Sequence, residues 1–227
     1  ALDWVSLASH PTPMTAATPP RAILLASDLS ARSDRAQARA VLLARQWQAR
    51  LVVLVALPDE AEFALPNHAR DADAPADGPP AETRASEVAR VARGALDGAG
   101  VPVEVRVATG EPGPLAVAAA RDAGCGLVVT GSSRSGVAMR VDPGSTVRWL
   151  ARHASVPVLA VHDRVAGPYR NVCVASDYSP AAAAALRLAD GWFADAEQRT
   201  LLHGYEVPLS TLALDDATRA AALSQAQ

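Results

Sequence analysis

The stretch GLVVTGSSRSGVAMRVDPGSTVRWLARHA (residues 126–154) decides the fold, because it joins a buried strand, a glycine-containing loop and a helix in that order. The apolar run over 126–130 predicts the strand, and the amphipathic segment over 146–154 predicts the helix. The loop from Gly131 to Ser145 lies directly before the helix, where backbone N–H groups and the helix dipole attract an anion. The stretch therefore predicts a phosphate site.

The same alternation of strands and helices fills residues 21–163. Apolar runs predict strands, and apolar residues at helical spacing predict the helices between them. This order, with right-handed crossovers, predicts an α/β fold with a doubly wound five-stranded parallel sheet, whose ligand crevice lies at the carboxyl ends of the strands. The predicted strands are 22–27, 51–57, 101–108, 126–130 and 156–162, and the predicted helices are 34–47 with Ser33 as its N-cap, 81–99, 112–123 and 146–154.

Two segments are predicted to lie outside this regular pattern. Residues 1–20 form an N-terminal extension, and four prolines between positions 11 and 20 predict that it has no regular element. Its apolar residues Trp4 and Val5 would dock on another part of the chain. Residues 58–80 are polar, acidic and interrupted by proline, and they predict a mobile loop.

An internal repeat follows a linker over residues 163–168. NVCVASDYS (171–179) echoes AILLASDLS (22–30), and each is followed by an alanine-rich amphipathic segment. Residues 164–227 are therefore predicted to be a partial second copy, with a β-α-β unit up to about residue 207 and a polar helix over 211–227. This copy has no counterpart of the glycine loop, so it cannot hold a complete second site. Asp177, which repeats Asp28, is predicted to be structural.

Composition excludes several classes of function. The chain of 227 residues has a net charge of −3, so no general nucleic-acid surface is expected. It contains no lysine, which excludes a P-loop lysine or a Schiff-base lysine. No run approaches the ~20 apolar residues that span a bilayer. The first residues lack the pattern of a signal peptide, so a soluble cytoplasmic protein is expected.

The cysteines and histidines predict no special chemistry. Cys125 and Cys173 lie next to or within predicted strands, where a small buried filler is expected. The five histidines share no metal-ligand spacing, and none is expected near a plausible nucleophile. No metal site is predicted from these residues.

Three motifs together resemble the universal stress protein family. They are Ser27-Asp28-Leu29-Ser30 after the first strand, the loop from Gly131 to Gly144-Ser145, and the closing run SVPVLAV (155–161). The resemblance covers 21–163 as a whole domain and about 169–207 as a partial one, as in a tandem member with a shortened second domain. It implies a stress-response regulatory module that binds ATP or a related adenine nucleotide, is not an enzyme, and forms a homodimer through strand 156–161. Mg²⁺ would accompany the nucleotide.

The resemblance also implies a set of binding residues in the first domain. Asp28 would lie near the adenosine, the loop would approach the phosphates at Gly131, and the start of the last helix would hold them. Each residue also has a plainer role: Asp28 would be a turn or capping residue, Ser145 would be an N-cap, and the glycines would serve tight turns. The implied nucleotide-binding residues are Ala26, Ser27, Asp28, Val55, Ala56, Gly131, Arg134, Gly144, Ser145 and Thr146.

Arg134 departs from the pattern of the ATP-binding members. Gly131 and Gly144-Ser145 have the family spacing, but Arg134 stands where the second glycine is expected. A left-handed backbone costs an arginine about 1 kcal/mol or more. Its side chain would either fill the phosphate volume or pair with phosphate bidentately. If it fills that volume, the protein would be a nucleotide-free dimerisation scaffold, and the sequence leaves both alternatives open.

Two further alternatives remain open. An enzyme of the wider adenine-nucleotide α-hydrolase group would need a positioned base or a cation, and no histidine or pair of carboxylates lies near the loop in sequence. The edge strand 156–161 would be covered by a second subunit or by the partial second copy.

Overall fold

The computed structural model describes residues 4–6, 17–30, 33–58, 81–132 and 144–204. The predicted loop beyond Pro58 and the predicted helix over 211–227 lie outside the described residues. The elements in chain order are β1 (Trp4–Ser6), β2 (Ala22–Ser27), α1 (Ser33–Trp47), β3 (Arg50–Leu57), α2 (Ala81–Ala95), β4 (Val103–Thr109), α3 (Pro112–Asp122), β5 (Leu127–Gly131), α4 (Ser145–His153), β6 (Val158–Val161), β7 (Asn171–Ser176), α5 (Pro180–Trp192) and β8 (Gln198–His203).

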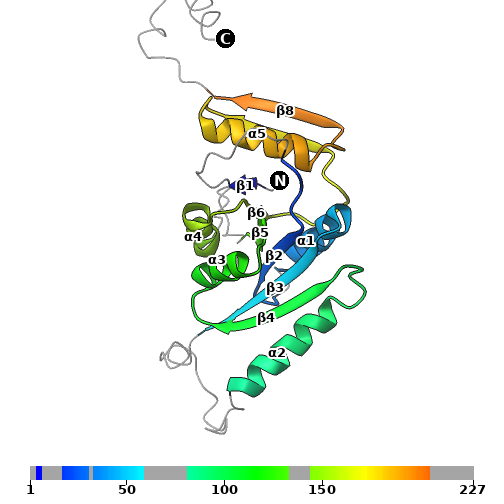
Figure 1. Ribbon diagram of the computed structural model, residues 1–227, viewed down its shortest axis with the longest axis vertical. Helices are drawn as coiled ribbons and strands as arrows, with labels where there is room; N and C mark the ends of the chain where they lie inside the picture. The colour runs from blue at the N-terminus through cyan, green and yellow to red at the C-terminus, as the bar shows by residue number, and fades with distance from the viewer. Residues whose placement is uncertain (1–3, 7–16, 31–32, 59–80, 133–143, 205–227) are drawn as a thin grey trace, which may run out of the picture.

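The main sheet has the strand order β1-β6-β5-β2-β3-β4. β6, β5, β2, β3 and β4 are parallel, which confirms the predicted five-stranded doubly wound sheet. The chain winds outward from β2 in both directions, so the order of the strands reverses between β2 and β5. α1 and α2 pack on one face of this sheet, and α3 and α4 pack on the other (Figure 1).

The central strands are buried on both faces, which explains their continuous apolar sequences. In β2, Ile23 and Leu25 belong to the core under α1 and α2, whereas Leu24 belongs to the core under α3 and α4. All three side chains are fully buried. Successive side chains of a strand point to opposite faces, so a strand covered on both faces needs apolar residues at every position.

The N-terminal extension contains a strand, so the prediction that it has no regular element was wrong. β1 pairs antiparallel with β6, with Trp4 opposite Ala160 and Ser6 opposite Val158. The prolines that argued against a regular element begin only at position 11, and they leave the segment Trp-Val-Ser free to extend. The edge of β6 supplies the backbone partners that a three-residue strand cannot find alone. The sheet therefore has a sixth strand.

The predicted β-α-β unit is present after the linker as β7, α5 and β8. β7 and β8 pair in parallel and form a separate two-stranded sheet, with α5 packed against it. Figure 1 shows this unit beyond β6 and β1, on the same side of the main sheet. The description of this unit as a shortened second copy of the first domain stays a prediction.

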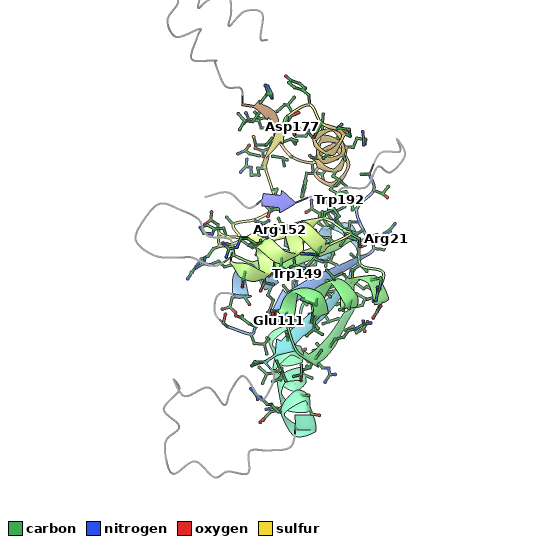
Figure 2. The ribbon with its side chains drawn as sticks, turned by 90° about the vertical axis from the view of Figure 1, so that its left-hand side faces the viewer. Arg21, Glu111, Trp149, Arg152, Asp177 and Trp192 are labelled. Carbon is green, nitrogen blue, oxygen red and sulfur yellow. The ribbon has the colours of Figure 1, made fainter. Side chains whose placement is uncertain are left out.

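Aromatic rings join the second unit to α1. Trp47 of α1 lies 5.4 Å from Trp192 and 6.1 Å from Phe193, measured between ring centroids. Phe193 in turn meets Tyr169, which lies between the linker and β7, edge to face at 5.4 Å. The Trp192 indole N–H donates to the carbonyl of Thr18 at 3.0 Å. Figure 2 shows Trp192 between the second unit and the main sheet.

A buried arginine of α1 holds the linker against this aromatic cluster. Arg39 is only 5% exposed, and its Nη1 donates to the carbonyl of Gly167 at 2.8 Å. Its guanidinium carbon lies 3.8 Å from the centre of the Tyr169 ring. Such a cation–π contact strengthens when both groups are shielded from water. α1 therefore contacts both the main sheet and the linker.

The second sheet leaves one predicted buried residue open to solvent. Cys173 in β7 is exposed, so the prediction that it is buried was wrong, whereas Cys125 is buried as predicted. β7 has a helix on one face only, whereas the main sheet is covered on both. Leu201 and Leu202 of β8 are exposed as well. None of the described helices is long and apolar enough to cross a membrane.

We expect Trp192→Ala to loosen the second unit from α1 while the main sheet stays intact. Large-to-small changes at buried aromatic positions cost roughly 3–5 kcal/mol, and this one also removes the hydrogen bond to Thr18. Hydrogen exchange should therefore accelerate in β7 and β8 and stay slow in β2 and β5. Val91→Ala, at a residue of α2 that is 48% exposed, serves as the control. Equal acceleration in both sheets would contradict this assignment of the contact.

Candidate functional site

The turn after β2 is organised around the Asp28 carboxylate. Oδ1 accepts from the Ser30 N–H at 3.0 Å, from the Ser30 hydroxyl at 2.7 Å and from the Ser33 hydroxyl. The Ser27 hydroxyl accepts from the Leu29 N–H at 3.1 Å, and Leu29 itself has a positive φ of 56°. These contacts lock the carboxyl end of β2 to the start of α1, so Asp28 has the role of a turn residue, which was one of its plainer alternatives.

The turn after β7 repeats this geometry. The Ser176 hydroxyl accepts from the Tyr178 N–H at 3.1 Å, and Asp177 Oδ1 accepts from the Ser179 N–H at 2.9 Å. Tyr178 has a φ of 61°, close to that of Leu29. The shared Ser-Asp-X-Ser sequence therefore forms the same turn twice. Asp177, labelled in Figure 2, holds this turn through the Ser179 N–H, and its purely structural role stays a prediction.

Hydrogen bonding keeps both aspartates ionised. Burial raises the pKa of Asp28, but the hydrogen bonds from Ser33 and Ser30 outweigh it and lower the pKa below the ordinary 3.8. Hydrogen bonds from the Ser179 side chain and backbone lower the pKa of Asp177 in the same way. The carboxylate at the end of β2 is therefore negatively charged well below neutral pH.

Strand register brings several of the predicted binding residues to one edge of the sheet. Ser27 lies opposite Val55 in the β2–β3 pair, so Asp28 and Ala56 follow at the same level. Ala26 lies opposite Thr130 in the β2–β5 pair, so Gly131 follows directly beside this turn. Ser27 and Val55 are buried and Asp28 is exposed, which leaves the carboxylate as the accessible group.

The residues predicted to hold phosphates begin α4. Gly144 is the N-cap of this helix and has a φ of 86°, a conformation that favours glycine. Ser145 is the first helical residue, so the alternative in which Ser145 is the N-cap was wrong. Because α4 connects the parallel strands β5 and β6, it starts at their carboxyl ends. Gly144, Ser145 and Thr146 thus lie at the same edge of the sheet as Asp28, whereas Arg134 lies outside the described residues.

A serine–histidine pair lies at this edge, and the sequence analysis missed it. The Ser132 hydroxyl lies 2.8 Å from His162 Nδ1. The expectation that no histidine lies near a plausible nucleophile was therefore wrong, because the two residues are adjacent in space although 30 positions apart in sequence. Ser132 directly follows β5, and His162 directly follows β6. A serine and a histidine directly after two neighbouring parallel strands would have been the sequence signal for this pair.

A cation lies beside the same pair. Arg35, in the first turns of α1, donates from Nη1 to the His162 carbonyl at 2.8 Å. Among the described residues, no group of three or more acidic, histidine or cysteine side chains is placed to hold a metal ion. The charged and hydrogen-bonding groups at this edge therefore suit an anion with hydroxyl groups better than a protein-bound metal.

An open cavity of about 480 Å³ lies elsewhere, between the end of α2 and the start of β4. Its lining includes Arg93, Asp97 and the turn residues up to Val103. This places it at the amino ends of the strands, opposite the edge that carries the aspartate turn. In doubly wound sheets the ligand crevice lies at the carboxyl ends, so we assign the candidate site there.

Comparison with known proteins gives one family and several structures. The sequence model described as "Universal stress protein family" matches residues 20–162. No curated protein matches the chain. A universal stress protein from Archaeoglobus fulgidus DSM 4304 is 21% identical, with a TM-score of 0.44; the match covers 63% of this chain and 44% of that one.

Two other similar structures were solved in complex with a nucleotide. A universal stress protein in complex with cAMP is 24% identical over 64% of this chain and 98% of that one, with a TM-score of 0.45. The universal stress protein from Archaeoglobus fulgidus in complex with dAMP is 20% identical over 65% of this chain and 99% of that one, with a TM-score of 0.43.

We expect Asp28→Asn to lower stability at neutral pH and to have little effect in acid. The folded state lowers the pKa of Asp28, so its carboxylate stabilises the fold above pH 3.8, and this contribution disappears as the pH falls through the lower folded-state value. The carboxylate is exposed and screened, so the loss at pH 7 should stay below about 1 kcal/mol. Urea unfolding at pH 7, 5 and 3 measures it.

Asp97→Asn, at an exposed position after α2, is the control. It should shift the unfolding free energy by the same small amount at each pH. A deficit of Asp28→Asn that grows as the pH falls would contradict the assignment.

Proposed function

Because the chain belongs to the universal stress protein family, we propose that residues 21–163 form a stress-response regulatory module that binds ATP or a related adenine nucleotide. The observation that carries the proposal is the geometry at the carboxyl ends of β2 and β5, where the strand order reverses. The turn with the ionised Asp28 and the start of α4, which Gly144 caps, both lie at this edge. A carboxylate can bind the hydroxyl groups of a nucleotide's sugar, and a helix N-terminus can bind its phosphates.

The residues at this edge fit the two ends of such a nucleotide. The hydrogen bonds that Asp28 accepts from the described serines converge on Oδ1, so Oδ2 is the oxygen that we propose for a ribose hydroxyl. Ala56 and the backbone of Ala26 would form the wall beside the adenine. The positive φ of Gly144 turns the chain into α4 without a side chain at the cap. Ser145 and Thr146 would then donate to phosphate oxygens.

A divalent cation would enter with the phosphates rather than on the protein. The described residues contain no cluster of metal-ligating side chains. Mg²⁺ prefers phosphate oxygens and water when few carboxylates are offered. We therefore propose Mg²⁺ as a companion of the nucleotide and not as a resident ion.

The homodimer implied by the resemblance has to compete with β1 for the edge of β6. β1 runs antiparallel to β6, which is the direction that β6 of a second copy related by a two-fold axis would take. Val158, Leu159 and Ala160 of β6 carry no charge and no proline, so the strand itself could pair with another chain if β1 were absent. We propose that a homodimer forms through β6 only when β1 leaves it.

We expect titration calorimetry to detect ATP binding by the full chain, and we expect Gly144→Ala to weaken it about tenfold. A side chain at φ 86° costs ~1–2 kcal/mol, which distorts the start of α4, and 1.4 kcal/mol corresponds to a factor of ten in affinity. Gly94→Ala, where a new Cβ meets nothing within 4 Å in α2, should leave the affinity unchanged.

Arg134→Gly distinguishes this proposal from the nucleotide-free scaffold. If the wild-type chain gives no heat with ATP, ADP or AMP and Arg134→Gly creates binding, the scaffold alternative is correct. If both bind, Arg134 is compatible with the phosphates. Silence of both proteins at millimolar nucleotide would overturn the nucleotide-binding proposal.

We expect light scattering to find the wild-type chain monomeric and the double variant Val5→Pro/Trp192→Ala shifted toward dimer. The proline removes a β1 backbone donor, and the alanine loosens the second unit, which lies on the same side of the main sheet (Figure 1). Val5→Thr keeps the strand preference and should remain monomeric. A wild-type dimer that the double variant does not alter would show that another surface is used.

A further inference from the structure

Two side chains beside the turn after β7 differ in chemistry from those beside the turn after β2. Tyr178 stands where the first turn has Leu29, and both residues have a positive φ. Strand register places Val55 opposite the serine of the first turn and His203 opposite the serine of the second. Two apolar residues are thus replaced by two aromatic residues that can form hydrogen bonds. The carboxyl ends of β7 and β8 therefore carry groups that the first turn does not have.

These two side chains form one surface cluster with Asp177. The ring centroids of Tyr178 and His203 are 4.5 Å apart, and Tyr178 is 73% exposed. Asp177 is exposed as well (Figure 2). Hydrogen bonds from Ser179 are the main cause of the lowered pKa of Asp177, and the charge of His203 adds a smaller effect, so the carboxylate and the imidazole lie close together. A carboxylate, a phenol ring and an imidazole are therefore within reach of one ligand.

Each of the three groups attracts a cation that can donate hydrogen bonds. Asp177 is ionised, and none of the ion pairs between the described residues includes it. His203 Nδ1 lies 2.7 Å from the Ser176 carbonyl oxygen. Because a carbonyl oxygen can only accept, the ring proton is on Nδ1, and Nε2 of the neutral ring is an acceptor. The face of the Tyr178 ring attracts cations through its quadrupole.

The start of α5 opposes a cation at this place, but only in part. A helix N-terminus carries roughly half a positive charge, whereas the Asp177 carboxylate carries a full negative one. The hydroxyl of Ser179, the N-cap of α5, accepts from the Ala182 N–H at 3.2 Å, and Pro180 has no N–H to offer. The N-terminus of α5 is thus already capped, and the local charge stays negative.

Among organic cations, a guanidinium group satisfies all three side chains at once. It is planar and stacks on aromatic faces, it has five N–H donors, and it stays charged at every ordinary pH. A primary ammonium group has donors but no plane to stack on the ring of Tyr178. A quaternary ammonium group has no donor for Asp177 or His203.

We propose that Asp177, Tyr178 and His203 bind a guanidinium group, which an arginine side chain of another protein or a small guanidine compound presents. The guanidinium plane stacks on the Tyr178 ring, and its N–H groups donate to the Asp177 carboxylate and to His203 Nε2. Asp177 then binds a ligand in addition to forming its turn. This inference goes beyond the proposed nucleotide binding and does not rest on it, because the two sites share no residue.

The experiment titrates the full chain, without nucleotide, with Nα-acetyl-arginine methylamide and follows the ring signals of Tyr178 and His203 by NMR. We expect saturable shifts with a dissociation constant in the millimolar range, because both the ring contact and the ion pair are exposed and screened. The citrulline derivative of the same shape has no charge and should cause no saturable shift. Tighter binding of methylguanidine would favour a small compound as the ligand, and tighter binding of the arginine derivative would favour a protein.

Four variants test the roles of the side chains. Tyr178→Leu removes the ring and Asp177→Asn removes the charge, and each should weaken binding about two- to fivefold. Tyr178→Phe keeps the ring and should bind as wild type, which a role of the phenol hydroxyl in structure alone does not predict. Asp195→Asn, at an exposed aspartate that follows α5 in the same unit, should leave the affinity unchanged.

Three results would overturn the inference. They are equal shifts with the citrulline derivative, no saturable shift at tens of millimolar ligand, and an affinity that neither Tyr178→Leu nor Asp177→Asn lowers. None of them bears on the proposed nucleotide binding, because Asp28 and the start of α4 take no part in this titration. Conversely, a chain that binds no ATP can still bind the arginine derivative, so the two proposals fail separately.

Discussion

Parallel pairing of β2 with β3 on one side and β5 on the other is the constraint on which the rest of the structure depends. It forces every connecting helix to return across a face of the sheet, and both faces become buried. It also brings the ends of β2, β3 and β5 to one edge. The aspartate turn and the start of α4 meet there because of this topology, although more than 100 residues separate them in sequence. The candidate site is therefore a direct consequence of the sheet.

The aromatic cluster around Trp47 is the second contact that organises the structure, and it acts through side chains rather than through backbone pairing. The chain has only nine aromatic residues apart from histidine, and four of them (Trp47, Tyr169, Trp192 and Phe193) gather between α1 and the second unit. Burying the Arg39 guanidinium there costs free energy, which the Gly167 carbonyl and the Tyr169 ring offset in part. One helix thus contacts the main sheet, the linker and the aspartate turn.

Local sequence patterns correctly predicted the helices and strands that depend on residues close together in the sequence. Apolar runs, alternating with polar residues in β4, predicted the five parallel strands. Apolar residues at helical spacing predicted α1, in which Ala36, Ala40, Leu43 and Trp47 are buried. The predictions that were wrong concern residues whose surroundings are formed by segments far away in the sequence. β1 exists because β6 offers it an edge, Cys173 is exposed because its sheet is covered on one face only, and Ser132 meets His162 through strand register. No pattern within a short window contains that information.

The sequence by itself determined the fold class, the family and the turn chemistry, because strand period, helix spacing and the Ser-Asp-X-Ser turn are properties of neighbouring residues. The tertiary structure alone decided which of the polar residues share one edge. The sequence shows a glycine loop with the family spacing, but it does not show which residues lie beside the ends of that loop in space. Parallel pairing places Asp28, Ser132, His162 and the start of α4 at the carboxyl ends of adjoining strands, and the chemistry that we propose follows from that proximity.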